Sequence, residues 1–211
     1  MKTITLILAL VISVYANATD EKYFEQMGKQ IQAVYAAQTI EQYQSAVNTF
    51  DRIAAAEKTK WEPYYYSAFG SVMMANKETE GAKKDAYLDK ALASIETGKG
   101  INPNESELVA LEGFVHMIRV TVDPGTRVQQ YSGMAFQTYS KALGMNPENP
   151  RTLAFMAQMQ MGMANFMGSP TTDACATVKK SLEKFTTYKS ENPLAPQWGK
   201  GMSDGLVKQC Q

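Results

Sequence analysis

The sequence contains a single histidine, His116, which limits the metal and nucleophilic chemistry open to the chain. A zinc site of the HExxH type needs two histidines on one helix face, and a Ser-His-Asp triad needs one held between a nucleophile and a carboxylate. Acidic residues such as Glu78, Glu80 and Asp85 are spread along predicted helices, a pattern typical of a solvated face. We therefore expect no catalytic residue, no metal and no cofactor, and predict that the protein is not an enzyme.

Methionine is abundant, with 13 residues in the chain and five of them between positions 156 and 167. Thioethers are soft ligands, so such a group could bind copper(I). However, Met156, Met159 and Met163 follow the i, i+3, i+7 spacing of a buried helix face, and methionine commonly fills irregular gaps in cores. We favour packing over metal binding for this segment.

The two cysteines, Cys175 and Cys210, both lie in the last quarter of the chain. In an oxidising compartment they would close a loop of about 35 residues and contribute on the order of 3 kcal/mol of stability. The alternative is a pair of independent thiols, since they form no CxxC motif. We favour a disulfide that holds the C-terminal segment onto the body of the protein.

The N-terminus has the pattern of a secretory signal peptide. Lys2 precedes an apolar stretch at 4–14, and residues 16–18, Ala-Asn-Ala, form a small-x-small cleavage pattern. The apolar stretch is too short to cross a bilayer, which requires roughly 20 residues. We predict that residues 1–18 are cleaved after Ala18 and that residues 19–211 are periplasmic or secreted without a membrane span; an uncleaved anchor is the alternative.

The charge balance argues against nucleic acid as a partner. The chain has 21 basic and 21 acidic residues, and its densest basic run is Lys179-Lys180 with Lys184 and Lys189 nearby. Proteins that bind a phosphate backbone usually carry a clear basic excess or a basic stripe. With 45% hydrophobic residues, the chain can form the core of one domain or a single repeat array.

Prolines divide the chain at regular intervals. Pro63, Pro103, Pro147 and Pro193 are 40, 44 and 46 residues apart, and the last three follow asparagine. Proline lacks the N–H donor, clashes with the preceding turn of a helix, and fits the first turn of the next one. Each proline therefore predicts a boundary between two helices, and the regular spacing indicates a repeat array.

A second pattern precedes three of these prolines. The spacing A-x3-Y-x2-A-x4-P occurs as Ala135, Tyr139, Ala142 and Pro147, as Ala91, Ile95, Gly98 and Pro103, and as Ser181, Phe185, Tyr188 and Pro193. Positions i, i+4 and i+7 share a helix face, where small residues let a partner helix approach. The pattern resembles the second helix of a tetratricopeptide repeat (TPR). Residues 66–73, Tyr-x2-Phe-Gly-x2-Met, are similar to the family's first helix, and residues 153–157 begin in the same way, whereas Glu112 departs from it.

The resemblance covers residues 22–195 and implies an all-α fold, with antiparallel helix hairpins stacked into a right-handed TPR-like α-α superhelix. Repeats of 40 to 46 residues exceed the family's 34, and the surplus falls in loops between paired helices. We expect one domain, 19–211, with hairpins at 21–60, 62–100, 104–145 and 149–191 and a capping helix at 195–210.

In the TPR family the inner side of the first helices lines a concave groove. Carried onto this sequence, that side provides these candidate ligand-binding residues: Tyr64, Ser67, Ser71, Met74, Ser106, His116, Arg151, Gln158 and Met161. With a single fixed charge, the set suits an extended peptide or a partner's helix better than a charged clamp. Core packing is the alternative for the tyrosines at 64–66.

These observations predict a non-enzymatic exported scaffold that binds an unidentified protein or peptide in its concave groove. The alternative is a periplasmic carrier or sensor of a small apolar ligand inside the superhelix, which a closed pocket above roughly 300 Å³ lined by Met156, Met159 and tyrosine rings would favour. A third possibility is self-association through an uncapped end. A groove filled by the chain's own tail would count against the first.

Overall fold

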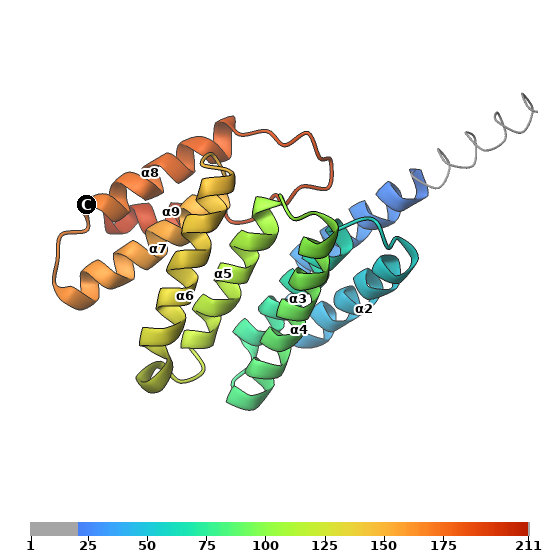
Figure 1. The fold of residues 1–211 in the computed structure, drawn as a ribbon, viewed down its shortest axis with the longest axis horizontal. Coiled ribbons are helices and arrows are strands. Elements are labelled where there is room, and N and C mark those ends of the chain that lie inside the picture. The colour runs from blue at the N-terminus through green and yellow to red at the C-terminus, as the bar shows by residue number, and fades with distance from the viewer. Residues whose placement is uncertain (1–20, 211) are drawn as a thin grey trace, which may run out of the picture.

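A computed structural model describes residues 21–210, and within this part of the chain the regular secondary structure is helical throughout (Figure 1). A first helix covers residues 21–36. The others are α2 (Ile40–Ala56), α3 (Glu62–Lys77), α4 (Gly81–Ile101), α5 (Ser106–Val120), α6 (Pro124–Met145), α7 (Pro150–Met167), α8 (Thr172–Thr187), α9 (Lys200–Leu206) and a short 3-10 helix, η1 (Val207–Gln209). The all-α prediction is confirmed. The predicted signal peptide lies outside the described residues.

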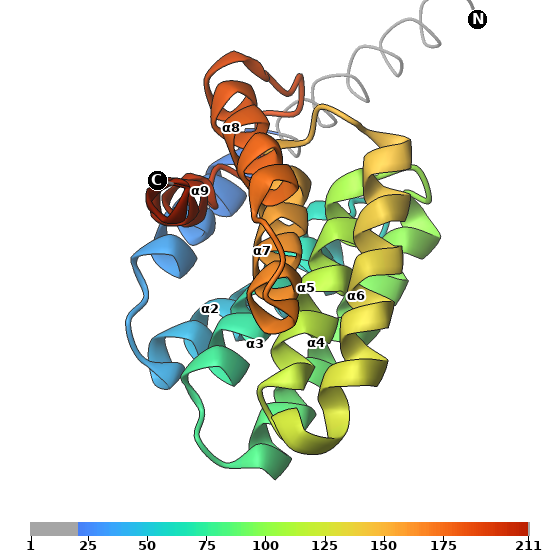
Figure 2. The ribbon, with the colours of Figure 1, turned by 90° about the vertical axis from the view of Figure 1, so that its left-hand side faces the viewer.

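Consecutive helices pack as antiparallel hairpins, α3 with α4, α5 with α6 and α7 with α8. The first helix of each hairpin also contacts the first helix of the next, α3 with α5 and α5 with α7. Figure 2 shows α4 and α6 toward one side of the molecule and α9 toward the other. This is the arrangement of a TPR-like α-α superhelix, as the sequence predicts.

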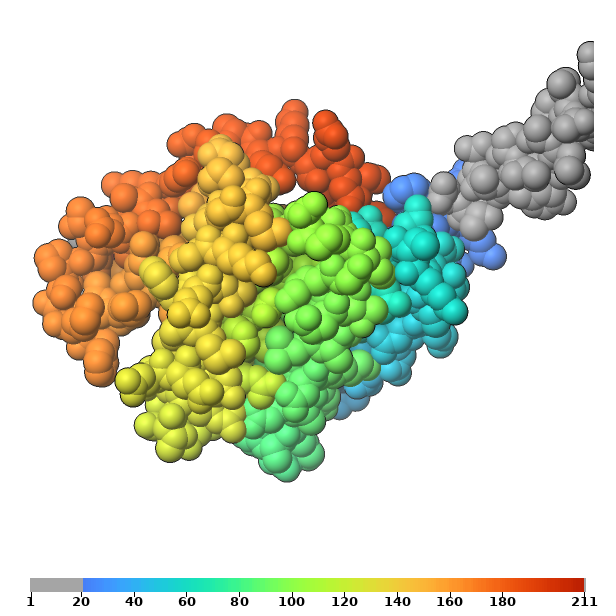
Figure 3. Space-filling model, in the orientation of Figure 1, coloured from blue at the N-terminus to red at the C-terminus, as the bar shows by residue number. Residues whose placement is uncertain are grey.

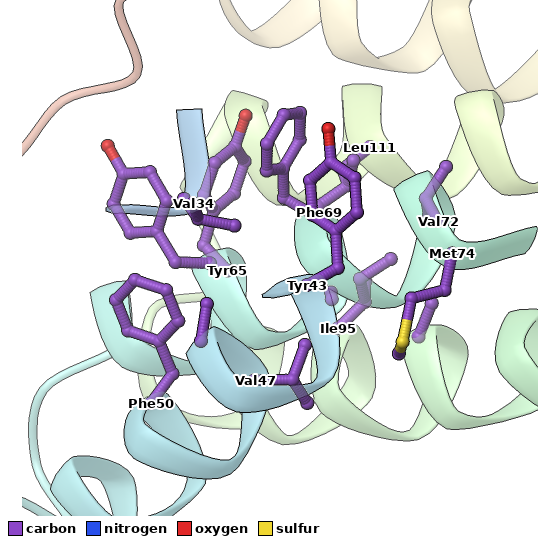
Figure 4. Packing of buried hydrophobic residues seen from close by; sticks show 14 of the residues in the cluster. Val34, Tyr43, Val47, Phe50, Tyr65, Phe69, Val72, Met74, Ile95 and Leu111 are labelled. Carbon is purple, nitrogen blue, oxygen red and sulfur yellow. The ribbon is translucent and has the colours of Figure 1, made fainter. Parts of the chain in front are cut away.

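The recurring small-large-small pattern packs as its spacing requires. Ala135, Tyr139 and Ala142 of α6 are fully buried, and the Tyr139 ring lies directly over Gly113 of α5. A Cβ atom on Gly113 would come within 2.4 Å of that ring, so no larger residue fits there without a shift. The larger core, part of which Figure 4 shows, is formed by the first helix and α2 to α5 around Phe50, Tyr65 and Leu111.

Asparagine before proline ends α4 and α6. Asn102 and Asn146 are the C-cap residues of these helices, and each backbone N–H donates to the carbonyl four residues earlier. Asn149 then caps α7, its side-chain oxygen accepting from the N–H groups of Arg151 and Thr152. The third signal differs, because α8 already ends at Thr187, so Asn192-Pro193 ends no helix and instead begins a turn in which the Ala195 N–H donates to the Asn192 carbonyl at 3.0 Å.

Residues 188–199, here called the C-terminal strap, run from α8 back across the molecule toward the first helices (Figure 3). Because the strap continues to Gly199, the last helix begins at Lys200. The start at position 195 predicted from the sequence is therefore wrong. Pro196 and Gly199 precede the first residue of α9. The φ angle of Gly199 is 105°, in the left-handed region, which is unfavourable for residues other than glycine. Cys210 is joined to Cys175 of α8, with 5.6 Å between the Cα atoms, so the predicted disulfide is confirmed.

Candidate ligand pocket

An apolar pocket of about 500 Å³ lies between the N-terminal helices, α5, α7 and the end of the C-terminal strap. It is lined by Val34, Tyr35, Tyr43, Phe69, Met73, Asn76, Phe114, Met117, Ile118, Gln158, Trp198, Gly199, Gly201 and Met202. None of these described lining residues is charged. The volume is within the range of small-molecule sites, which are mainly apolar with a few placed polar groups.

Trp198 forms the centre of the aromatic wall. Its ring lies 4.7 Å from Phe69 of α3, 6.0 Å from Phe114 of α5 and 5.7 Å from Phe155 of α7, measured between centroids. The indole N–H donates to the Tyr65 hydroxyl at 3.0 Å, which fixes the ring's orientation. Phe69, Phe114 and Trp198 therefore present aromatic surface to the pocket, while Phe155, which is 1% exposed and does not line it, packs behind the Trp198 ring.

The polar groups of the pocket are neutral. The Tyr35 hydroxyl donates to Tyr66 Oη at 3.4 Å and accepts from the Gln197 N–H at 3.2 Å. Burial raises the pKa of Tyr35 and of Tyr43, so both phenols stay protonated at neutral pH. Gln158 Oε1 is buried and has no hydrogen-bond partner among the residues that the structure describes.

The C-terminal strap is held across α3 by two hydrogen bonds in addition to the one between Trp198 and Tyr65. Tyr66 Oη donates to the Leu194 carbonyl at 2.7 Å, and the Asn192 side chain donates to Glu62 at 3.0 Å. Leu194 is buried in the main core. The chain's own C-terminal segment thus occupies part of the surface that the first helices present.

A second cavity, also of about 500 Å³, lies under the strap at the N-terminal ends of α3, α5 and α7. Arg151 and Glu107 form a buried ion pair beside it, with Arg151 Nε donating to Glu107 Oε2 at 2.9 Å and a second bond to Oε1. A further Arg151 nitrogen donates to the Trp198 carbonyl at 3.2 Å. All the guanidinium nitrogens are therefore engaged, and Arg151 fastens the strap to α7.

Most of the residues predicted to line a concave groove are packed inside the protein. Seven of the nine are buried, namely Ser67, Ser71, Met74, Ser106, His116, Arg151 and Met161, while Tyr64 and Gln158 are half-buried. Gln158 lines the apolar pocket and Arg151 lines the second cavity, but the structure brings no others of this set to either. Ligand contact through this set stays a prediction.

His116 and the methionines of α7 contribute to packing. The His116 ring stacks on Tyr131 with 6.2 Å between centroids, and residues 21–210 hold no group of three or more His, Cys, Asp or Glu side chains suited to a metal ion. Met156 and Met159 are buried, but Met163 is exposed, contrary to its core-like spacing, because it lies near the end of α7 beside Phe166, which is 92% exposed.

The sequence pattern does not reveal the aromatic residues of the pocket. It assigns Trp198 only to a capping helix and Phe69 only to a repeat motif. The local cue is a tryptophan between Pro196 and Gly199, where proline and glycine interrupt any helical pattern.

The fold and the pocket together define a helical binding scaffold of the TPR-like type. The structure is similar to that of the HusA haemophore from Porphyromonas gingivalis, with a TM-score of 0.80 and 25% identity over 90% of this chain and 92% of that chain. It is also similar to TTC0263, a thermophilic TPR protein in Thermus thermophilus, with a TM-score of 0.50 and 14% identity over 85% and 87% of the two chains, a likeness of fold alone. Neither a protein-family model nor a curated protein sequence matches the chain significantly. Within the described residues, no helix has the length and apolar character needed to cross a membrane.

Proposed function

We propose that this protein is a non-enzymatic carrier of haem or a related tetrapyrrole, bound in the apolar pocket. The observation that carries the proposal is the uncharged aromatic wall around Trp198, Phe69 and Phe114, in a chain similar along nearly its whole length to a haemophore. A planar macrocycle gains most from burial of its two faces against such rings. Its carboxylates would lie at the mouth of the pocket, in water.

The lining residues fit a tetrapyrrole held mainly by apolar contact. Haem iron in proteins is commonly ligated by His, Cys, Met or Tyr. His116 does not line the pocket, and both cysteines are bridged. The available groups are the Met73, Met117 and Met202 thioethers and the two phenols, which burial keeps protonated because it raises the pKa of each. We therefore expect macrocycle contact to supply most of the affinity.

A titration of the oxidised protein with haemin and with metal-free protoporphyrin IX tests this function. The Trp61→Phe variant leaves Trp198 as the only tryptophan, so its fluorescence reports directly on the pocket. We expect quenching and a shifted Soret band with both ligands. Phe69→Ala should weaken binding by tenfold or more, whereas the control Phe166→Ala, at an exposed site away from the pocket, should not. If the protein has the circular-dichroism spectrum of a folded helical protein but binds neither ligand, the proposed function is refuted.

Binding of a protein or peptide on the concave side is a second proposal, supported by the TPR-like fold. Oxidised residues 19–211, immobilised and exposed to an envelope extract, should retain a partner that the Tyr64→Ala variant releases. Tyr64 is chosen because it is half-buried, whereas alanine at Arg151 would leave Glu107 as a buried unpaired charge. Equal capture by both proteins would argue against the concave side.

We also propose export, which is supported by the disulfide, since such bonds persist in oxidising compartments. Mass spectrometry of protein recovered from the cell envelope or medium should show an N-terminus at Thr19. Recovery of only the uncleaved chain would contradict the predicted cleavage after Ala18.

A further inference from the structure

The Tyr43 hydroxyl is a hydrogen-bonding group without a partner at the wall of the apolar pocket. The Tyr43 side chain is 5% exposed and lines the pocket, yet its oxygen makes no hydrogen bond to any other residue between positions 21 and 210. Burial alone shifts the pKa of Tyr43, whereas hydrogen bonds also act on the pKa of Tyr35 in the same pocket. Because most buried polar groups in proteins are paired, this exception is explained if its partner arrives with the ligand.

The Tyr43 oxygen is also accessible from the pocket. Within residues 21–210, the side-chain atoms that are both unpaired and sealed from solvent belong to His116, Thr152, Gln158 and Gln160. The Tyr43 oxygen is not one of them, so another molecule can reach it. Figure 4 shows the hydroxyl pointing away from the α2 backbone, on the side of the Phe69 ring, which lines the same pocket.

Tyr43 lies toward the end of the pocket that opens to solvent. It is near the start of α2, and Asn76, which is exposed and also lines the pocket, is near the end of α3. The two helices pack as an antiparallel pair joined by a short loop, so the start of one lies beside the end of the other. The described lining residues include no lysine, arginine or histidine, so an acidic group of the ligand must stay at this end, where water reaches it.

We infer that the Tyr43 hydroxyl orients the ligand by donating a hydrogen bond to one carboxylate of the tetrapyrrole at the open end of the pocket. This inference rests on the proposed tetrapyrrole function. The nitrogens of the macrocycle point to its centre, so the carboxylates are the acceptors at its edge. A hydrogen bond to a carboxylate is roughly twice as strong as one between neutral groups. With the ring against Trp198 and the acidic edge at Tyr43, the pocket selects planar apolar ligands that carry an anionic edge.

Two metal-free porphyrins test the inference, because they share a ring and differ in their acidic groups. Mesoporphyrin IX has two propionic acid side chains, and etioporphyrin I has ethyl groups in their place. Porphyrin fluorescence measures the Kd of each for the wild type and for Tyr43→Phe, which removes only the hydroxyl. We expect the mesoporphyrin Kd to rise about tenfold in the variant and the etioporphyrin Kd to stay constant, because one hydrogen bond to a charged group is lost.

Tyr35→Phe is the matched control, since the Tyr35 hydroxyl belongs to the same pocket but is already paired with Tyr66 and Gln197. It should lower the melting temperature and change both Kd values by the same factor. Tyr43→Phe should not lower the melting temperature, because it removes a group that has no partner in the ligand-free protein.

Three results would overturn the inference while the proposed function stands: a lower melting temperature for Tyr43→Phe, an unchanged mesoporphyrin Kd, or an equal loss of affinity for the two porphyrins. Absence of binding of both porphyrins to the wild type would overturn the inference and the proposed function together.

Discussion

The indole N–H of Trp198 donates to the Tyr65 hydroxyl at 3.0 Å, joining two residues 133 positions apart in the sequence. Tyr65 is fully buried in α3, so the bond attaches the end of the C-terminal strap to the rigid core. The aromatic wall of the pocket therefore depends on a contact between the C-terminal strap and α3. A ligand that binds beside Trp198 would report on whether the strap is docked.

Replacement of Trp198 should separate the ring's packing from its hydrogen bond. Trp198→Phe keeps an aromatic ring but leaves the Tyr65 hydroxyl buried without its donor, and should cost about 1–2 kcal/mol. Trp198→Ala also removes the contacts with Phe69 and Phe114 and should cost about 3 kcal/mol. Urea unfolding of both variants measures the difference. Equal stabilities would show that the aromatic contacts contribute little.

The disulfide should stabilise both the fold and the pocket. Cys175 and Cys210 are separated by 35 residues, and loss of the crosslink should lower the free energy of unfolding by about 3 kcal/mol. Because Met202 of α9 lines the pocket between the strap and Cys210, the double serine variant should also bind haemin more weakly. Hydrogen exchange should increase at residues 200–209 but not in α5. Unchanged exchange there would mean that packing alone holds α9.

Much of the repeat architecture is predictable from the sequence, because a helix–helix contact leaves a local record. Ala135 and Ala142, the small residues on the same face of α6 as Tyr139, and the asparagines that end α4 and α6 lie at fixed spacings that physical chemistry explains. The strap leaves no such record. Asn192-Pro193 matches the earlier stop signals, yet the Tyr66 hydroxyl binds the Leu194 carbonyl 128 residues away, a pairing without a local pattern. Local spacing therefore identifies the repeat faces but not the segment that covers them.

Arg151 shows the same limitation at one residue. Its position on the repeat suggests a ligand-binding cation, but it is buried with Glu107, and together they hold the strap through the Trp198 carbonyl. Arg151→Met should cost about 3–5 kcal/mol, because Glu107 is left buried without a counter-charge. Adding Glu107→Leu should recover part of this loss. A double-mutant cycle from urea unfolding checks the coupling, and strictly additive losses would contradict it.

His116 should make stability depend on pH. Burial lowers the pKa of its imidazole below the ordinary value of about 6.5; Glu112 opposes this shift, while Arg119 and Lys99 add to it. The unfolded chain therefore binds a proton at a higher pH than the folded protein does, and unfolding becomes easier as protons are taken up. The stabilising contribution is complete above about pH 6.5 and is lost as the pH falls through the lower folded-state pKa.

The His116→Phe variant isolates this contribution, since it keeps a ring against Tyr131 but cannot titrate. Carboxylates such as Glu105, whose pKa burial raises, titrate in both proteins and cancel in the comparison. We expect the wild type to lose more unfolding free energy than the variant between about pH 7.5 and about pH 5.0, measured by urea denaturation at each pH. Parallel pH profiles would show that the imidazole takes up its proton equally easily in the folded and unfolded chains, and that burial at α5 does not disfavour its charge.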